Sequence, residues 1–543
     1  MQKKIKEGIY FKSLLLKNRG KIIFCSFLGF LSSCFIVGFA FTSKFLLDEA
    51  LVSTSNFLGS KLMWLIIVLI LLVIGEIVSY FFFNYFANKF INDLEKTERH
   101  SMFSKSLTID YSEFLDKSNA SYLTILSKDI TAISEGVFTL IPSFVSYVTR
   151  ITISIIMLFV LDYIFALIFL SVGVVIFILS KFLRKKNKEF NNYLLLEEEK
   201  VLGFYNESLF NTDIFRIFNN YPSVYKKEEQ INSSYVLSKN KKYNFNIVIN
   251  TLFSFLLRIS FVLAIGYFSL NFNPSFTAGS MLGSVQLISN IEGPFSSLSG
   301  LFSKYYSLLS NSSRIEEILN KKTASKSPLK EEFKRIDINN VSFSYKENQN
   351  VINNISFDIL PKEFILIEGI SGAGKSTFVK LLLGLLKPNS GTLTINNKLE
   401  TYDVSNLFAY VPQNNFIIFG TLEDNLRYFN DSISKEKMIE VLTNVGLDKY
   451  IDKLDTMLSS LSDGMSIGEI QRIGIARAIL LDSEILVLDE ASSSLDVANE
   501  EKILTYLKSL KKTIIFISHR SVVKSFATKV IKFTKGSIKV EVL

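Results

Sequence analysis

The chain has 543 residues, 48% of them hydrophobic, with 49 Phe and a formal charge of +9. This length allows two or more domains, and the apolar share favours a membrane protein over a soluble one. The charge does not indicate nucleic acid, because seven basic residues lie in the first 21 positions, directly before an apolar run, as in the cytoplasmic flank of a membrane span. The two cysteines, Cys25 and Cys34, lie inside that run, where a thiol acts as a small hydrophobe rather than as a disulfide or metal partner.

The first apolar run is long, lacks a small-residue cleavage site and is followed by further runs, so we expect an anchor rather than a cleaved secretory signal. The connections at 184–188 and 239–242 are basic, whereas 271–276 carries no charge. The positive-inside rule therefore predicts a multi-pass protein of the cytoplasmic membrane with both termini in the cytoplasm. The stretches long enough to span a bilayer as helices are 22–42, 62–83, 138–161, 163–182, 247–270 and 277–301.

Two long connections, 84–137 and 183–246, are rich in helix formers, so we expect helices that continue past the membrane and bend at short elements within 109–130 and 206–221. Ordinary amphipathic loop helices are the alternative. A polar stretch with one Pro marks a linker at 321–334. The predicted fold is an α-helical membrane domain of six long helices over 1–320, followed by an α/β P-loop nucleotide-binding domain over 335–543.

A phosphate-binding pattern, "EGISGAGKST", begins at Glu368, between an apolar strand-like run and the helical stretch "KSTFVKLLLGLL". Glycines let backbone N–H groups approach phosphates, and the helix N-terminus adds its dipole. We expect Lys375 to reach the β- and γ-phosphates of a nucleotide and the Ser376 hydroxyl to bind Mg²⁺. The residues expected around the phosphates are Gly369, Ser371, Gly372, Ala373, Gly374, Lys375, Ser376 and Thr377.

Two acids follow a second apolar run in "SEILVLDEASSSLD", at 483–496. Asp489 is placed to hold Mg²⁺ directly or indirectly, and Glu490 to polarise an attacking water. A solvated turn is the alternative for an isolated acidic strand end, but the phosphate pattern upstream favours catalysis. A third run, "TIIFISHR", ends in His519, which we expect to contact the γ-phosphate. The other histidine, His100, receives no role.

With these motifs the chain resembles the ATP-binding cassette exporters, in the half-transporter form that joins six spans to one nucleotide-binding domain. The resemblance covers nearly the whole chain. It implies that Tyr345 stacks on adenine, that Gln413 links Mg²⁺ to the membrane elbows, and that Asp496 is the acid of the family's D-loop. It also implies that "GMSIGEIQRIGIARAIL" is the family signature, with Ser466 and Gly468 in contact with ATP, and that the elbows are coupling helices.

The signature departs from the family pattern. Ile467 stands at its first glycine, Met465 and Glu469 replace the usual Leu and Gln, and Ser460 stands where exporters usually carry an acid. A β-branched residue adds bulk where a phosphate should approach, so we expect Ile467 to weaken the ATP sandwich. The resemblance implies that a second chain completes each ATP site. We expect a homodimer, because the catalytic residues are all present, with a related half-transporter as the alternative partner.

The resemblance implies ATP-driven export by alternating access, with ATP and Mg²⁺ as cofactors, membrane lipid around the spans and no nucleic acid partner. Glu76 and Glu292 are candidates for contacting the substrate, since charges at bilayer depth usually face a cavity or a partner. Pairing with Arg150 and Arg258 is the alternative. Gly293 and Pro294 should interrupt or kink the sixth span. We expect an amphipathic cargo, such as a peptide, drug or lipid. A lipid flippase, an ATP-gated channel or a regulatory membrane ATPase would share every motif.

Overall fold

The computed structural model describes residues 8–52, 61–270, 277–324, 326–345, 350–458, 465–534 and 537–543. The chain forms two compact units. The first contains Met1–Ile109 and Leu115–Lys322, and the second contains Asp110–Phe114 and Thr323–Leu543. The predicted Ser460 and the basic residues at positions 3, 4 and 6 lie outside the described residues.

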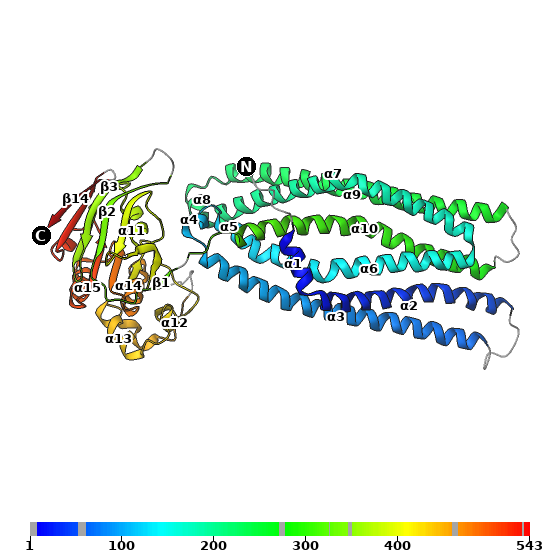
Figure 1. Cartoon of the computed structure of the whole chain (residues 1–543), viewed down its shortest axis with the longest axis horizontal. Helices are drawn as coiled ribbons and strands as arrows, with labels where there is room; N and C mark the ends of the chain where they lie inside the picture. The colour runs from blue at the N-terminus through cyan, green and yellow to red at the C-terminus, as the bar shows by residue number, and fades with distance from the viewer. Residues whose placement is uncertain are drawn as a thin grey trace. The chain divides into compact units, whose positions relative to one another are not determined.

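The first unit is helical (Figure 1). Short helices flank long ones, and the π-helix η1 directly precedes α6. The helices are α1 (Ile9–Lys17), α2 (Arg19–Val52), α3 (Lys61–Thr108), α5 (Asn119–Thr124), η1 (Ile125–Asp129), α6 (Ile130–Leu161), α7 (Tyr163–Phe210), α8 (Thr212–Phe218), α9 (Tyr221–Leu270) and α10 (Ala278–Leu319).

The three longest helices extend far beyond the thickness of a membrane. α3 and α7 have 48 residues each and α9 has 50. At about 1.5 Å per residue each is roughly 70 Å long, against about 30 Å of hydrocarbon, so each extends well beyond a bilayer. Within the described residues, four helices are long and apolar enough to span: Arg19–Leu51, Lys61–Thr108, Ser121–Leu161 and Tyr221–Leu263. The count of six spans stays a prediction.

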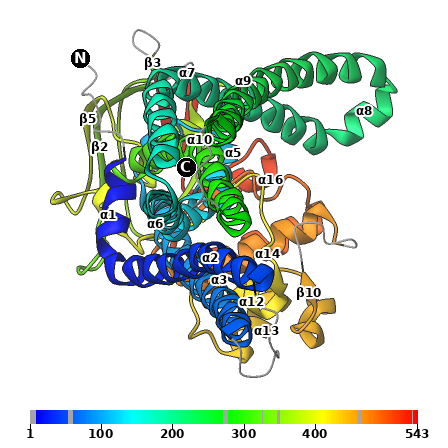
Figure 2. The same cartoon turned by 90° about the vertical axis from the view of Figure 1, so that its right-hand side faces the viewer.

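The spans pack through small and apolar side chains. Val37 on α2, Leu158 on α6, Phe253 on α9 and Leu287 on α10 belong to one buried cluster. Viewed end-on in Figure 2, α2, α3, α6 and α10 form one group, and α7 and α9 run side by side with α8 at their joint tip. Many large apolar side chains on the long helices are exposed, as expected for a surface that faces lipid.

Three sequence expectations for this unit can be compared with the structure: the joint at Asp162, the two elbows and the interruption of the sixth span. α6 ends at Leu161 and α7 begins at Tyr163, so Asp162 joins the third and fourth predicted spans, as expected. Short helices occupy both predicted elbows. In contrast, α10 is one helix from Ala278 to Leu319 with Pro294 inside it, so the sixth span is not interrupted there, and the alternative of a kink stays a prediction. A proline removes one helical hydrogen bond, which neighbouring packing in a membrane helix can tolerate.

The second unit contains a six-stranded sheet in the order β14-β13-β4-β12-β11-β8 and a four-stranded antiparallel sheet in the order β3-β2-β5-β6. In the larger sheet all pairs are parallel except β13–β14. Its strands are β4 (Phe364–Gly369), β8 (Phe408–Val411), β11 (Ile485–Asp489), β12 (Thr513–Ile517), β13 (Lys529–Thr534) and β14 (Ser537–Val542). The smaller sheet contains β2 (Ile336–Ser344), β3 (Asn350–Ile359), β5 (Ser390–Ile395) and β6 (Leu399–Glu400).

Two further pairs of short strands complete the unit, β1 (Ser327–Pro328) with β7 (Val404–Ser405) and β9 (Gly420–Thr421) with β10 (Met457–Leu458). Its helices are α4 (Tyr111–Phe114), α11 (Lys375–Leu382), η2 (Thr401–Asp403), α12 (Leu422–Arg427), α13 (Lys435–Asn444), η3 (Asp448–Lys453), α14 (Ile467–Leu480), α15 (Val497–Ser509) and α16 (Ser521–Lys524).

The parallel strands are buried on both faces. Successive residues of β11 point to opposite faces of the sheet, so that Leu486 and Val487 belong to two different hydrophobic clusters. This explains why these strands read as continuous apolar runs in the sequence.

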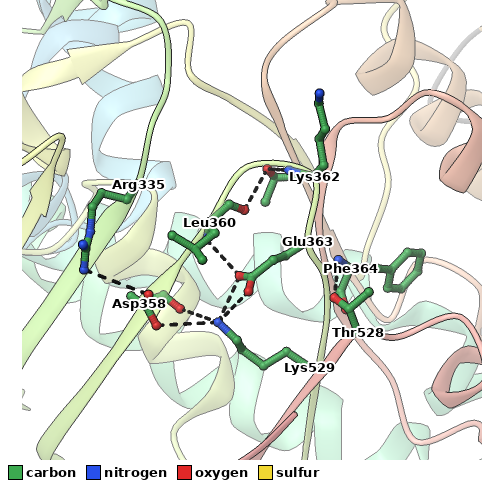
Figure 3. A network of polar contacts seen from close by, with 9 residues as sticks. Arg335, Asp358, Leu360, Lys362, Glu363, Phe364, Thr528 and Lys529 are labelled. Atoms are coloured by element: carbon green, nitrogen blue, oxygen red, sulfur yellow. Dashed lines mark hydrogen bonds and ion pairs between the residues drawn. The ribbon is translucent and has the colours of Figure 1, made fainter. Parts of the chain in front are cut away.

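The turn before β4 is held by contacts to a buried lysine (Figure 3). Lys529 donates to the Asp358 carbonyl at 3.0 Å and pairs with Glu363 at 2.8 Å, which joins β13 to the turn before β4.

Candidate nucleotide site

The predicted phosphate loop and acidic residues lie at one edge of the six-stranded sheet. β4, β12, β11 and β8 are mutually parallel, so their carboxyl ends meet at the same edge. β4 leads into the phosphate loop, β11 ends at Asp489, β12 precedes His519 and β8 precedes Gln413. The sheet topology therefore brings together residues from four separate stretches of sequence.

The glycines of the loop hold backbone shapes that a side chain would obstruct. Gly369 has φ +152°, and a Cβ there would lie 2.5 Å from the Phe533 carbonyl oxygen. Gly374 has φ +100°, precedes α11 as its N-cap, and a Cβ there would lie 2.9 Å from the Val351 carbonyl oxygen. The loop can therefore approach an anion with its backbone at the start of a helix.

Lys375 is buried, with 8% of its surface exposed. Its ammonium donates to the carbonyls of Gly369 and Ile370, the latter at 3.2 Å, and contacts His519 Nε2 at 3.2 Å. An ammonium has three N–H donors, and these three acceptors match them. The contact joins the phosphate loop to the end of β12.

The other residues of the predicted phosphate loop lie on either side of Lys375 in the sequence, and their exposure to solvent differs. Ser371, Gly372 and Ser376 are exposed, whereas Ala373 and Thr377 are buried. Tyr345 is half-exposed beyond the end of β2 and meets Phe343 edge-on, with ring centroids 5.0 Å apart. Its hydroxyl lies 3.4 Å from Thr377 Oγ1, so the predicted adenine-stacking ring is beside the predicted phosphate loop.

Asp489 and Glu490 have different environments. Asp489 is buried, and burial, followed by the neighbouring Glu490 charge, raises the pKa of its carboxyl. Tyr410 of β8 donates to its Oδ2 at 3.5 Å. Glu490 has a left-handed backbone, with φ +50°, and its Oε2 accepts from Gln413 Nε2 at 2.8 Å. Non-glycine residues in this region are strained, and such strain gathers at functional sites.

Sequence reasoning missed residues that fix this edge of the sheet. Tyr410 contacts Asp489, yet no motif marks it. Arg520 follows His519 directly and donates to the carbonyls of Ser493 and Leu495 and to Glu500 Oε2, at 2.8 to 2.9 Å. Glu500 is 1% exposed and also accepts from Ser492 Oγ. The available signal was an acid at helical spacing with Ile503, Leu504 and Leu507, which places it on the apolar face of α15.

The predicted signature residues lie at the N-terminus of α14. Ser466 is its N-cap, and a Cβ on Gly468 would lie 3.1 Å from the Ser494 carbonyl oxygen, so this glycine permits close packing against the segment after β11. Ile467 is 71% exposed, so its side chain lies on the surface rather than in the core. Asp496 is exposed and caps α15, where its Oδ1 accepts from the Asn499 N–H at 2.8 Å.

The predicted substrate-contacting acids lie on the long helices of the first unit. Glu292 on α10 pairs with Arg258 on α9, with Arg258 Nε 3.4 Å from Glu292 Oε1, and the arginine side chain is 77% exposed. Glu76 on α3 interacts electrostatically with Arg150 on α6, whose buried Nε has no hydrogen-bond partner among the described residues. The Arg258–Glu292 pair matches the ion-pair alternative that the sequence left open, and for Glu76 and Arg150 that alternative stays a prediction.

Two family models match the chain. The ABC transporter transmembrane region matches residues 22–294, half of the chain, and the ABC transporter model matches residues 352–493. This chain belongs to the ABC transporters. The two models in one chain, and relatives named for export, place it among the exporters that join a membrane region to a nucleotide-binding domain.

Relatives of this ABC transporter extend over nearly its whole length. An export ATP-binding/permease protein of Rickettsia conorii is 26% identical over 96% of this chain and 92% of its own length. A lactococcin transport/processing ATP-binding protein of Lactococcus lactis is 36% identical, but over 37% of this chain and 30% of its own length. The solved structure of a bacterial Atm1-family ABC exporter with ATP bound matches with a TM-score of 0.84, covering 97% of this chain and 95% of that one at 16% identity, which supports the fold.

Proposed function

We propose that this ABC transporter is a dimeric, ATP-driven exporter of an amphipathic substrate. The observation that carries the proposal is the convergence of Lys375, Asp489, Glu490, Gln413 and His519 at one sheet edge, in a chain that also carries the transporter membrane region. The proposed domains are those expected above: 1–320 for the membrane, 321–334 as linker and 335–543 for the nucleotide.

ATP binding follows from the ABC transporter domain, and we assign its contacts by the geometry of the site. The phosphates would lie over the N-terminus of α11, with Lys375 turned toward them, and the adenine against the exposed ring of Tyr345. Asp496 would act from the D-loop. His519 contacts Lys375 and is exposed, so it can meet a γ-phosphate held at the same loop.

Ser376, Gln413 and Asp489 fit Mg²⁺ as hydroxyl, amide and carboxylate oxygen donors. Among the described residues there is no cluster of three His, Cys, Asp or Glu side chains, which suits Mg²⁺ because it binds nucleotide sites through one or two carboxylates plus phosphates. A cation beside Asp489 would favour the charged form of this carboxyl, which burial and then the neighbouring Glu490 charge disfavour by raising its pKa. When bound, Mg²⁺ neutralises charge on the β- and γ-phosphates.

Glu490 is the proposed catalytic residue that polarises the attacking water. Its left-handed backbone turns the chain at the end of β11, and the hydrogen bond from Gln413 holds one carboxylate oxygen. The other oxygen is then available to orient a water toward the γ-phosphate. Gln413 therefore contacts the residue proposed to orient the water and is itself a proposed Mg²⁺ donor. A change of this one side chain should affect both water activation and Mg²⁺ binding.

A second chain would supply Ser466 and Gly468 to the far side of each ATP. Two exposed features support this dimer. The N-terminus of α14 is open, with Ile467 on the surface, and α8 carries exposed Ile217 and Phe218, 78% and 75% accessible. Large apolar side chains on a polar-rimmed helix tip indicate a protein contact. We propose a homodimer; a related half-transporter is the alternative partner.

The short helices at the elbows are the proposed coupling elements. Asp110–Phe114 groups with the second unit, where Tyr111 packs against a hydrophobic cluster and the Lys380 ammonium lies 5.7 Å from its ring. Lys380 belongs to α11, which begins at the phosphate loop. Closure of the ATP dimer would move this segment and, with it, the spans between inward-open and outward-open states.

The cargo is proposed to be amphipathic, such as a peptide, drug or lipid, moved across the cytoplasmic membrane by six spans with both termini in the cytoplasm. The lactococcin relative supports a peptide. Glu76 and Glu292 stay the proposed contacts for a cationic group, which would compete with their arginine partners. A lipid flippase and an ATP-gated channel or regulatory ATPase of the same fold are the alternative functions.

The test uses the full-length protein in lipid vesicles with ATP outside, together with amphipathic peptides, drugs and fluorescent lipids. Export predicts that at least one compound raises ATP hydrolysis and accumulates inside the vesicles, and that Lys375→Ala abolishes both. Lipid movement alone would favour the flippase. Flux that needs ATP binding but no hydrolysis would favour a channel. ATP hydrolysis without any movement would contradict a transporter.

A further inference from the structure

Glu469 is a buried acid at the N-terminus of α14, where 6% of its surface is exposed. One carboxylate oxygen, Oε2, accepts from the Ser466 N–H at 2.8 Å, and the Ser466 hydroxyl accepts from the Glu469 N–H at 3.3 Å. This is a reciprocal capping box. The other oxygen, Oε1, forms an ion pair with Lys449, which belongs to the separate helix η3.

The Glu469 carboxylate lies where the exporters that this chain resembles carry a neutral glutamine. Burial alone would raise the pKa of Glu469, but the Lys449 ammonium and the Ser466 N–H together hold it below its usual value. The residue is therefore charged at neutral pH. A negative charge at this helix N-terminus opposes the approach of a polyphosphate and reduces the attraction of the helix dipole.

We propose that Lys449 is a positioning residue that neutralises Glu469, so that the N-terminus of α14 accepts the γ-phosphate of an ATP held by a second chain. This inference rests on the proposed function, in which the signature of one chain faces the ATP of the other. It assigns to Lys449 a role in ATP recognition through Glu469, without contact between the lysine and the nucleotide.

The cap alone does not require Lys449. Glutamine at the same position completes a capping box as well as glutamate does. The Lys449 side chain is 60% exposed, but the Glu469 side chain is only 8% exposed, so losing Lys449 leaves a buried carboxylate without its partner and costs stability. A double variant with Glu469→Gln removes that charge as well, and so separates the effect on ATP from the effect on the free energy of unfolding.

The experiment compares ATPase activity of the full-length protein in lipid nanodiscs with Lys449→Gln, Glu469→Gln and the double variant. Lys437→Gln is the control for loss of a surface lysine, since Lys437 pairs with Glu440 at 2.8 Å on α13 and both side chains are 51% exposed. The thermal unfolding midpoints of Glu469→Gln and of the double variant should agree with the parent, because the cap persists, whereas Lys449→Gln should lower the midpoint by leaving the buried carboxylate unpaired. These measurements separate a change in the KM for ATP from a change in folding.

Lys449→Gln should raise the KM for ATP about fivefold, the effect of losing one neutralising charge near the phosphate, and leave kcat within about twofold. Glu469→Gln should keep or lower the KM, and the double variant should match Glu469→Gln, because no charge then needs neutralising. Lys437→Gln should match the parent. A Lys449→Gln protein with the parental KM, or a double variant as impaired as Lys449→Gln, would overturn the inference.

Failure of the proposed function gives a different result. In that case the parent would show no ATP hydrolysis that Lys375→Ala removes, and the inference would fail with it. If hydrolysis depends on Lys375 but the KM for ATP is the same in the parent, Lys449→Gln, Glu469→Gln and the double variant, the role of Lys449 is contradicted and the proposed function is not.

Discussion

The nucleotide-binding unit and the membrane unit both contain paired charges, but different features of the chain bring the partners together. Lys375 meets His519 because two parallel strands end at one sheet edge, and each residue lies in a short motif. Arg258 meets Glu292 through packing between α9 and α10, and no local pattern marks the pair. The sequence therefore predicted which residues act together at the edge of the parallel sheet, whereas for the long helices it gave ion pairing only as an alternative and did not say which charges meet.

The largest expected effect concerns the sheet edge. Glu490→Gln should reduce ATP turnover by about 10² to 10⁴, the usual contribution of a general base, because the amide cannot accept a proton from water. ATP should still bind and hold the dimer closed. Hydrolysis and ATP-dependent dimerisation of the purified variant are the measurements.

Lys375→Ala serves as the contrast for that variant, since it should lose hydrolysis together with the contacts to the phosphates. A Glu490→Gln protein that turned over ATP at a near-normal rate would remove Glu490 as the residue that polarises water. The acidic motif at 483–496 would then have predicted the wrong catalytic residue for this edge of the sheet.

A second test compares one buried acid from each unit. Glu500 pairs with Arg520, and Asp129, 2% exposed, pairs with Arg314 through two hydrogen bonds. Removing either arginine leaves an uncompensated buried carboxylate, at a cost of about 3 kcal/mol. Arg520→Met should lower the unfolding midpoint of the nucleotide unit and its ATPase activity.

Arg314→Met should destabilise the membrane unit and leave the unfolding of the nucleotide unit unchanged. Calorimetry of the detergent-solubilised protein can resolve the two transitions. Adding Glu500→Gln to Arg520→Met should restore part of the lost stability, since the buried charge is then absent. No restoration would mean that Arg520 acts through the carbonyls of Ser493 and Leu495 instead.

The third effect is the pH dependence of Mg²⁺-dependent ATP binding. Burial and the Glu490 charge raise the pKa of Asp489, and a protonated Asp489 cannot hold Mg²⁺. The affinity for ATP with Mg²⁺ should therefore be at its maximum when the pH is well above this raised pKa. It should fall as the pH drops through the pKa. In Glu490→Gln the neighbouring charge is gone, so the fall should shift to lower pH.

Titration calorimetry with ATP and Mg²⁺ checks this shift. At an acidic pH within the fall, Glu490→Gln should bind about two- to threefold more tightly than the parent, after normalising each protein to its affinity at neutral pH. Burial remains, so the dependence should not disappear. An identical pH profile in the two proteins would exclude Glu490 as a cause of the raised pKa.

The smallest effects are expected in the membrane unit. The Arg258–Glu292 pair joins α9 and α10 at 3.4 Å, with the arginine side chain 77% and the glutamate side chain 27% exposed. If Glu292 contacts a cationic cargo, Glu292→Gln should lower stimulation of ATPase by cationic peptides about threefold, whereas Arg258→Gln should not. Unchanged basal activity and stimulation in both variants would leave the pair as a structural contact and remove Glu292 from the substrate site.

The sequence by itself determined the fold class and the family, because twenty-residue apolar runs and the phosphate loop each follow from local physical requirements. Backbone groups must be satisfied within a bilayer, and a phosphate needs glycines at a helix start. The acidic end of one apolar run and the histidine after the next also predicted that Asp489 and His519 would act on the same nucleotide as Lys375. The structure agrees in placing all three at one edge of the sheet, and their catalytic roles stay predictions.

Only the tertiary structure decided contacts between elements that are distant in sequence. Arg520 holds Glu500, and Lys449 meets Glu469, across connections whose paths no motif encodes. The left-handed backbone of Glu490 and the continuity of α10 through Pro294 were likewise settled by packing. Local propensities set what a segment prefers, but side-chain pairing depends on which surfaces meet once the helices and sheets have packed.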